Sequence, residues 1–149
     1  SAASEVCKGQ ANHGTVGAVA LDIHGELAAG TSTGGTFGKL AGRVGDTPII
    51  GSGTWADDTV AVSCTGLGEA FMRANAAYDV SARMRYGKVK LMQACHAVLD
   101  DVARFGGDGG LIAIDAAGHI AMPYNSDGMK RAAVSNSMDS VVQVFEPEP

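Results

Sequence analysis

The chain has 149 residues, which is the length of one domain, and 46% hydrophobic with 18% charged residues is a globular composition. No apolar run approaches the roughly 20 residues of a membrane-spanning helix, which argues against a membrane protein of that kind. The net charge is −5 and the 11 basic residues are scattered, so the sequence disfavours nucleic acid or an anionic membrane as a partner.

The cysteines and histidines follow neither a disulfide pattern nor a metal-binding pattern. Cys7, Cys64 and Cys95 are odd in number and far apart, and no two of them form a CxxC pair, so we expect buried or idle thiols. The four histidines share no ligand spacing, and the sequence therefore predicts no structural zinc. The cysteine usage and the lack of an apolar leader at the N-terminus favour a cytoplasmic location.

Four strands are predicted in the first half of the chain from β-branched apolar runs separated by turn residues. They cover residues 16–21, 26–32, 49–55 and 59–65. Residues 1–14 are small and polar without any period, and we interpret them as a linker. Gly25 lies in the first turn at a position that needs a positive φ, and Asp57 with Asp58 forms the turn of a second hairpin. Residues 34–46 hold five glycines, which predicts a loop.

Two consecutive helices are predicted in the middle of the chain. The first opens at residues 66–69, and its apolar side is made of Phe71, Ala74, Ala77, Tyr78 and Met84. The second runs from Leu91 to Phe105 with apolar residues at i, i+3, i+4 and i+7, and Gly106 and Gly107 end it. Three further strands are expected over residues 111–115, 119–124 and 141–145.

The order of strands, two helices and strands again predicts an α+β fold. Because the helices follow one another, both pack on one face of an antiparallel sheet, and a doubly wound parallel sheet is not expected. The nearly continuous apolar run at residues 16–21 is typical of a strand that is buried on both faces. Since no further helices are predicted, a second sheet or a partner chain must cover the other face.

Glycines adjoin hydroxyl-bearing residues at Gly14-Thr15, residues 31–35 and residues 63–68. In the third segment a strand leads through glycines into a helix, where free N–H groups can stabilise an anion such as the oxyanion of acyl transfer. Arg43 and Asp46 are a cation and an anion on one loop, and such a pair could clamp a zwitterion. Each pattern alone is also typical of an ordinary turn or of a solvated ion pair.

Four segments taken together in this order resemble a known family. They are GTVGAVALD at 14–22, TSTGG at 31–35, GRVGDTPIIGSG at 42–53 and SCTGLGE at 63–69, followed by PYNSDGM at 123–129. They resemble the plant-type L-asparaginase/isoaspartyl aminopeptidase family of N-terminal-nucleophile hydrolases. The resemblance implies half of an αββα sandwich, in which residues 1–14 end the α-subunit region and residues 15–149 form the catalytic β-subunit.

The resemblance also implies a catalytic apparatus. The precursor would cut itself between Gly14 and Thr15, and the hydroxyl of Thr15 would then be the nucleophile. Its own α-amine would be the base, since an α-amine titrates at about 7.7–8.0, whereas a lysine titrates at about 10.4. Thr33 would tune the nucleophile, and the Thr65 hydroxyl with the Gly66 N–H would form the oxyanion hole.

The substrate implied by the resemblance is a β-aspartyl amide, either an isoaspartyl dipeptide or L-asparagine. Arg43 would hold its α-carboxylate with the Gly68 N–H nearby, and Asp46 would hold its α-ammonium together with the backbone around Gly66. No cofactor is expected, although a structural sodium or an activating potassium is possible by analogy. The expected partners are the α-subunit half of the same precursor and a second α/β pair.

Three alternatives stay open at this point. Glycosylasparaginases share positions like Thr15, Arg43 and Asp46, but the segment before their arginine typically has Ser-Gly where this chain has Thr33-Gly34-Gly35. A protease of the taspase type is a weaker alternative. The chain could also be a non-enzymatic binding module with the same fold, although the presence of all three threonines, Thr15, Thr33 and Thr65, argues against it.

Overall fold

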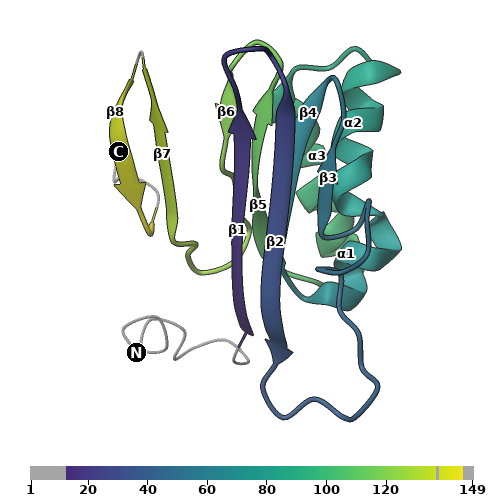
Figure 1. Cartoon of the computed structure of the whole chain (residues 1–149). Coiled ribbons are helices and arrows are strands. Elements are labelled where there is room, and N and C mark those ends of the chain that lie inside the picture. The colour runs from purple at the N-terminus through teal and green to yellow at the C-terminus, as the bar shows by residue number, and fades with distance from the viewer. Residues whose placement is uncertain (1–12, 137, 146–149) are drawn as a thin grey trace.

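The computed structural model describes residues 13–136 and 138–145, which form a layered antiparallel α+β structure (Figure 1). The strands are β1 His13–Leu21, β2 Leu27–Thr36, β3 Thr54–Ala56, β4 Val60–Gly66, β5 Gly109–Asp115, β6 Ile120–Ala121, β7 Arg131–Ser135 and β8 Met138–Gln143. The helices are α1 Gly68–Ala74, α2 Ala76–Arg85 and α3 Leu91–Arg104. The predicted fold class is confirmed.

The central layer is an antiparallel sheet with the strand order β3-β4-β5-β6. The helices cover one of its faces, and the β1–β2 hairpin lies against the other face near β4 (Figure 1). Helices, sheet and hairpin thus follow one another as successive layers, as in half of an αββα sandwich. The described helices do not include one that is long and apolar enough to cross a bilayer.

Strand β4 is the buried centre of this arrangement. Val60, Val62 and Cys64 are every second residue of this strand, so their side chains share the face toward the helices and belong to the main hydrophobic core. The same core contains Phe71, Val80, Val98 and Val102 from the helices, and Leu111 from the neighbouring strand β5. Ala61 and Ser63 are also buried, because the hairpin covers the second face of the strand.

Residues 16–21 were expected to be buried on both faces, with a second sheet or a partner chain as the cover, and burial of the open face by a partner chain stays a prediction. Val16 in β1 is 72% exposed, because one side of the hairpin carries no described layer. The strand that has the buried character on both faces is β4. Apolar composition alone does not separate a strand that is covered by its own chain from one that is left open.

The strand predicted at residues 49–55 is mostly a series of turns, and only Thr54–Ala56 forms β3. The Ile49 N–H donates to the Asp46 carbonyl at 2.9 Å, and the Ser52 N–H donates to the Ile49 carbonyl at 3.0 Å. Gly51 has φ +93°, a conformation that glycine reaches without strain and that interrupts an extended chain. The β-branched isoleucines therefore suggested a strand where the glycines dictate turns.

The first predicted helix is divided in two at Asn75. This residue has φ 47° and ψ 48°, so it ends α1 in the left-handed conformation and starts α2 in a new direction. Its N–H donates to the Met72 carbonyl at 3.1 Å, as in a helix C-cap. The second predicted helix is confirmed as α3, and Gly106 follows it with φ +75°.

Several boundaries differ from the predictions. β1 begins at His13, within the range interpreted as a linker, and the rest of that range lies outside the described residues. β2 continues to Thr36, so the glycine-rich loop begins three residues later than expected. Strand β7 was missed, because its alanine-rich sequence RAAVS has no clear period of two. Gly25 has φ +83° as predicted.

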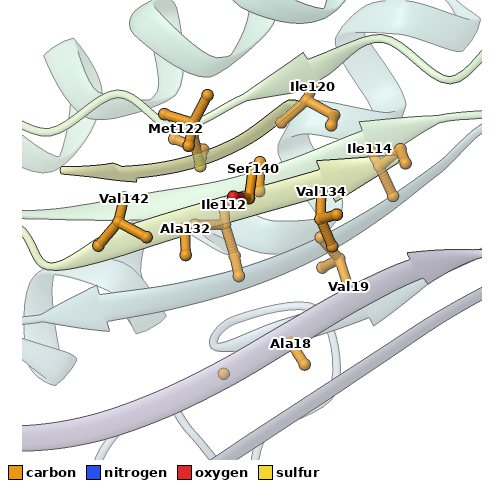
Figure 2. A pocket seen from close by; sticks show the side chains of 13 residues that line it. Ala18, Val19, Ile112, Ile114, Ile120, Met122, Ala132, Val134, Ser140 and Val142 are labelled. Atoms are coloured by element: carbon orange, nitrogen blue, oxygen red, sulfur yellow. The ribbon is translucent and has the colours of Figure 1, made fainter. Parts of the chain in front are cut away.

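Strands β7 and β8 border an apolar cavity of about 360 Å³ together with β1 and the central sheet (Figure 2). Its walls include the side chains of Val19, Ile112, Ile120, Met122, Val134 and Val142. The residues predicted for catalysis and substrate binding do not line this cavity. Its chemistry suits the burial of apolar side chains and not the binding of a zwitterion.

Candidate active site

The hydroxyl of Thr33 joins the two residues that flank the predicted cleavage bond. Its Oγ1 donates to the Gly14 carbonyl oxygen at 2.8 Å and accepts from the Thr15 hydroxyl at 3.2 Å. The Gly35 N–H donates to the same oxygen at 2.9 Å, which fixes the orientation of this hydroxyl. The predicted nucleophile, its predicted neighbour and the predicted scissile carbonyl are therefore brought together.

An irregularity in the β1–β2 hairpin creates this arrangement. Thr15 lies opposite Thr33, but His13 lies opposite Thr36. Between these two register pairs β2 therefore has one more residue than β1. Gly35 has φ +80° at this bulge, a conformation that costs glycine little. The Thr33 hydroxyl therefore reaches the Gly14 carbonyl at the point where the regular ladder of the hairpin is interrupted.

Thr65 and Gly66 lie at the end of β4, directly before α1. Gly66 has φ +143°, and a Cβ there would lie 2.2 Å from the Asp108 carbonyl oxygen. Only glycine fits this close approach, so the strand can turn sharply into the helix. The structure thus places the predicted oxyanion residues at a strand end, as the sequence indicated.

The start of β1 and the end of β2 lie at the same end of the molecule as α1, which directly follows β4 (Figure 1). Three strand ends from distant parts of the sequence therefore converge there. The loop after β2 continues at this end and carries the two charged residues predicted to clamp the substrate.

Asp46 is a buried carboxylate with an unused acceptor. Its side chain is 5% exposed, and Oδ2 has no hydrogen-bond donor among the described residues. Burial raises the pKa of this carboxyl, and the charge of Glu69 adds to the increase. The backbone N–H groups of Asp46 and Thr47 and the charge of Arg43 act in the opposite direction. A buried carboxylate with a free oxygen is a strong site for a cationic group.

Two glycines make room for Asp46. A Cβ on Gly53 would lie 2.6 Å from the Asp46 carbonyl carbon, and a Cβ on Gly68 would lie 2.9 Å from the Asp46 nitrogen and 3.0 Å from its Oδ1. Any side chain at either position would displace the acid. Gly68, at the end of the predicted Thr65–Gly68 segment, therefore also serves to position the charged loop.

Arg43 is held by Glu69 through two parallel hydrogen bonds. Nε donates to Oε1 and Nη2 donates to Oε2, both at 2.8 Å, and the hydrogen bond to Glu69 is the main cause of the raised pKa of Arg43. This pair occupies one edge of the guanidinium group. The end formed by Nη1 and the second Nη2 proton is not used by Glu69 and can still receive a carboxylate.

Glu69 was missed by the sequence analysis, which treated it only as part of the SCTGLGE segment. Nothing in sequence spacing predicts that residues 43 and 69 meet, because the contact joins a loop to the first turn of α1. The acidic residue in that turn was the available signal, since helices favour acids at their N-terminal ends. The Arg43–Asp46 pair itself does lie beside the glycine-rich strand end, as expected.

Among the described residues, the thiols and acids form no second chemical centre. Cys64 and Cys95 are buried as expected, and burial raises the pKa of Cys95 to about 12, while Cys7 lies outside the described residues. Such thiols are unreactive at neutral pH. In the part of the chain that the structure describes, no three histidine, cysteine or acidic side chains gather as a metal site would require.

Comparison with known proteins gives consistent matches. Residues 1–144 match the protein family described as Asparaginase. The chain is 58% identical over 121 residues to an isoaspartyl peptidase of Escherichia coli, which covers 80% of this chain and 38% of that protein. It is 54% identical over 121 residues to a putative isoaspartyl peptidase/L-asparaginase of Dictyostelium discoideum, covering 81% and 35%.

A third relative is the plant-type L-asparaginase of Pyrococcus horikoshii, which is 44% identical over 126 residues. That match covers 84% of this chain and 41% of the relative. The chain therefore spans less than half the length of these curated relatives. Every residue of the candidate site lies within the part that matches the family.

Proposed function

The chain belongs to the asparaginase family, and on that premise we propose that it is the catalytic β-subunit part of a hydrolase for β-aspartyl amide bonds. The substrates are isoaspartyl dipeptides and L-asparagine. The observation that carries the proposal is the Thr33 hydroxyl, which bonds at once to the Gly14 carbonyl and to Thr15. Because the chain spans only part of its relatives, the activity belongs to the protein with its α-subunit region present.

Maturation is the first step of the proposed mechanism. The Thr15 hydroxyl attacks the Gly14 carbonyl carbon, and its proton passes to the Thr15 nitrogen as the C–N bond breaks. The hydrogen bond from Thr33 to the Gly14 oxygen supports the negative charge that develops there. Water then hydrolyses the resulting ester, which leaves a Gly14 carboxylate and a free α-amine on Thr15.

The new α-amine of Thr15 supplies the general base for turnover. Its pKa, about 7.7–8.0 for an ordinary N-terminus, leaves a useful neutral fraction near pH 7.5, and its position on the nucleophile itself needs no further residue. The Thr15 hydroxyl attacks the β-carbonyl, Thr65 and Gly66 bind the oxyanion, and an amine or ammonia leaves. Water then releases aspartate from the Thr15 ester. Thr33 remains hydrogen-bonded to the nucleophile.

Charge complementarity supports an α-amino acid moiety as the bound group. The unused oxygen of Asp46 would accept the α-ammonium, and the free end of Arg43 would bind the α-carboxylate. The close packing of Gly68 against Asp46 supports its placement at the same subsite. With both charges at the α-carbon held in this way, the β-carbonyl is the group left to react.

The rest of the enzyme would cover the open side of the hairpin. Val16 in β1 and Val142 in β8 are 72% and 80% exposed, and the apolar cavity of Figure 2 lies between their strands. We propose that the α-subunit of the same precursor packs over this side and that two α/β pairs associate. Residues 1–14 would then be the end of the α-subunit region.

Hydrolysis of β-aspartyl-leucine by the protein with its α-subunit region tests the proposal, with α-aspartyl-leucine as the control because it has the same atoms and an α bond. We expect cleavage of the β-linked dipeptide only, and none by Thr15→Ala. Glycosylated asparagine is the competing substrate. Its turnover at a rate comparable to that of the dipeptide would favour a glycosylasparaginase, and no turnover of any substrate would favour a binding protein.

A further inference from the structure

A partly buried relay of hydrogen bonds lies where the β1–β2 hairpin crosses the central sheet. The Thr31 Oγ1 lies 3.1 Å from the Gly53 carbonyl oxygen and 2.7 Å from the Ser63 Oγ. A carbonyl only accepts, so the Thr31 proton is used for Gly53 and Ser63 is the donor to Thr31. We call these three groups, Ser63, Thr31 and Gly53, the hydroxyl relay.

The relay lies at a close approach between the two layers. Ser63 is 4% exposed, and a Cβ on Gly17 would lie 2.0 Å from its Oγ. Gly17 is the register partner of Thr31, so both strands of the hairpin meet Ser63 at the same level. The hairpin backbone therefore cannot approach β4 more closely without a clash between Gly17 and Ser63. It also cannot move away from β4 without breaking the relay.

The proposed catalytic residues lie two residues further along each of these strands. Thr15 precedes Gly17 by two residues, Thr33 follows Thr31 by two, and Thr65 follows Ser63 by two. Because side chains alternate along a strand, residues two apart lie on the same face, about 6.5–7 Å from one another. The relay is thus separated by two residues along each strand from the proposed nucleophile and from the proposed oxyanion residues.

Nucleophile and oxyanion residues belong to different layers, which are not joined by a common backbone ladder. Gly17 has no side chain where β1 crosses β4, so side-chain interlocking alone does not hold the layers against sliding at this point. The directional hydrogen bond between the buried Ser63 and the partly buried Thr31 opposes such sliding. Geometry at a reacting centre must be held within about 1 Å, so a small slide is enough to slow the reaction.

We propose that Ser63 and Thr31 are positioning residues that hold the Thr15–Thr33 pair at its working distance from the Thr65–Gly66 end of β4. The inference rests on the proposed function. It assigns to these two hydroxyls an effect on the chemical step, and it assigns them no contact with substrate.

The test compares Thr31→Val, which removes the hydroxyl but keeps the shape, with Thr31→Ser, which keeps the hydroxyl. Ser63→Ala removes the donor. Thr59→Val is the matched control, because it makes the same change in the turn between β3 and β4, where the Thr59 hydroxyl makes only a long exposed bond to Asp58. The readouts are kcat per processed Thr15 terminus and KM for β-aspartyl-leucine, with the α-subunit region present.

We expect Thr31→Val and Ser63→Ala to lower kcat at least tenfold with KM within twofold of the parent. Thr31→Ser should stay within threefold and Thr59→Val within twofold. A merely structural role would lower the melting temperature but leave kcat per processed site unchanged. If Ser63→Ala does not fold, the two Thr31 variants decide the matter.

Equal kcat values for Thr31→Val and Thr31→Ser in an active enzyme would overturn this inference and leave the proposed function intact. A parent protein without turnover of any β-aspartyl substrate would overturn both.

Discussion

The hydroxyl oxygen of Thr33 lies 2.8 Å from the carbonyl oxygen of Gly14, and it is the donor in that hydrogen bond. The bond polarises the carbonyl that the neighbouring Thr15 hydroxyl attacks in the proposed maturation. Since a carbonyl oxygen gains negative charge during attack, the hydrogen bond becomes stronger as the reaction proceeds. The irregularity of the hairpin therefore places a hydrogen-bond donor at the carbonyl that is proposed to react during maturation.

Replacing Thr33 by valine should slow cleavage at Gly14–Thr15 by about 100-fold or more, because loss of one oxyanion donor costs about 10²–10³ in rate. Thr33→Ser keeps the donor and should process within about tenfold of the parent. The measurement is a time course of intact mass. Equal cleavage rates for the valine and serine variants would mean that another group stabilises the Gly14 oxyanion.

Arg43→Ala should raise KM for β-aspartyl-leucine by about 10- to 150-fold, since charge-assisted hydrogen bonds contribute about 1.5–3 kcal/mol. Steady-state kinetics measure the effect, and an analogue whose α-carboxylate is amidated is the control, because its KM should not depend on Arg43. An unchanged KM for the dipeptide would remove Arg43 from the binding site.

Glu69→Gln should have a smaller effect in the same direction. The Glu69 side chain is 50% exposed, so its ion pair with Arg43 is screened by solvent and contributes under about 1 kcal/mol, or up to about fivefold in KM. In an Arg43→Ala background the Glu69→Gln change should add nothing. A full effect of Glu69→Gln in that background would show that Glu69 acts independently of Arg43.

The burial of Asp46 predicts an acid limb in the pH profile. The folded-state pKa is raised above the usual value of 3.8, so Asp46 takes up a proton at a higher pH than an ordinary aspartate. Protonated Asp46 cannot pair with an ammonium group, and KM should therefore rise as the pH falls through the raised pKa. A KM of the parent that stays flat from pH 7 to pH 4 would contradict this role.

The same shift predicts the sign of the effect on stability. A raised carboxyl pKa means that the protonated form is favoured by folding, so this contribution is present below the unfolded pKa and is lost as the pH rises through the folded pKa. Asp46→Asn removes the buried charge and should raise the melting temperature at pH 7, with the gain shrinking toward pH 4. A loss of stability at pH 7 would show that the charged carboxylate is well compensated in the free protein.

Local patterns predicted much of this structure. The turn at Gly25, the hairpin at Asp57 and the stripe of α3 are confirmed, because each depends on residues that are close in sequence. The close backbone approach at Gly66 and Gly68 was also foreseeable from the glycine-rich segments, since such an approach requires glycine whatever the partner is. The roles assigned to Thr15, Thr33 and Thr65 remain predictions.

Contacts between residues that are far apart in the sequence could not be predicted from it. The Arg43–Glu69 pair and the Thr31–Ser63 bond join segments more than 20 residues apart, and no periodicity encodes them. The break at Asn75 was missed for a different reason. The residues around it keep a helical pattern, and the change of direction depends on one left-handed residue that packing against the sheet selects.

Asn75 gives a direct test of that break. Asn75→Gly should keep or slightly raise stability, whereas Asn75→Val should destabilise the fold by about 1–2 kcal/mol, because a β-branched residue is disfavoured in the left-handed conformation. Urea unfolding measures both variants. Equal stability of the two would mean that α1 and α2 fuse into one helix without cost.

The central claim is that Thr15 becomes the N-terminal nucleophile. Its most direct test is N-terminal sequencing with intact mass, carried out on the protein with its α-subunit region after incubation at neutral pH, beside Thr15→Ala. We expect a new terminus at Thr15 in the parent, and the uncut chain in the variant. Hydrolysis of β-aspartyl-leucine by a parent chain that is still joined at Gly14–Thr15 would contradict it.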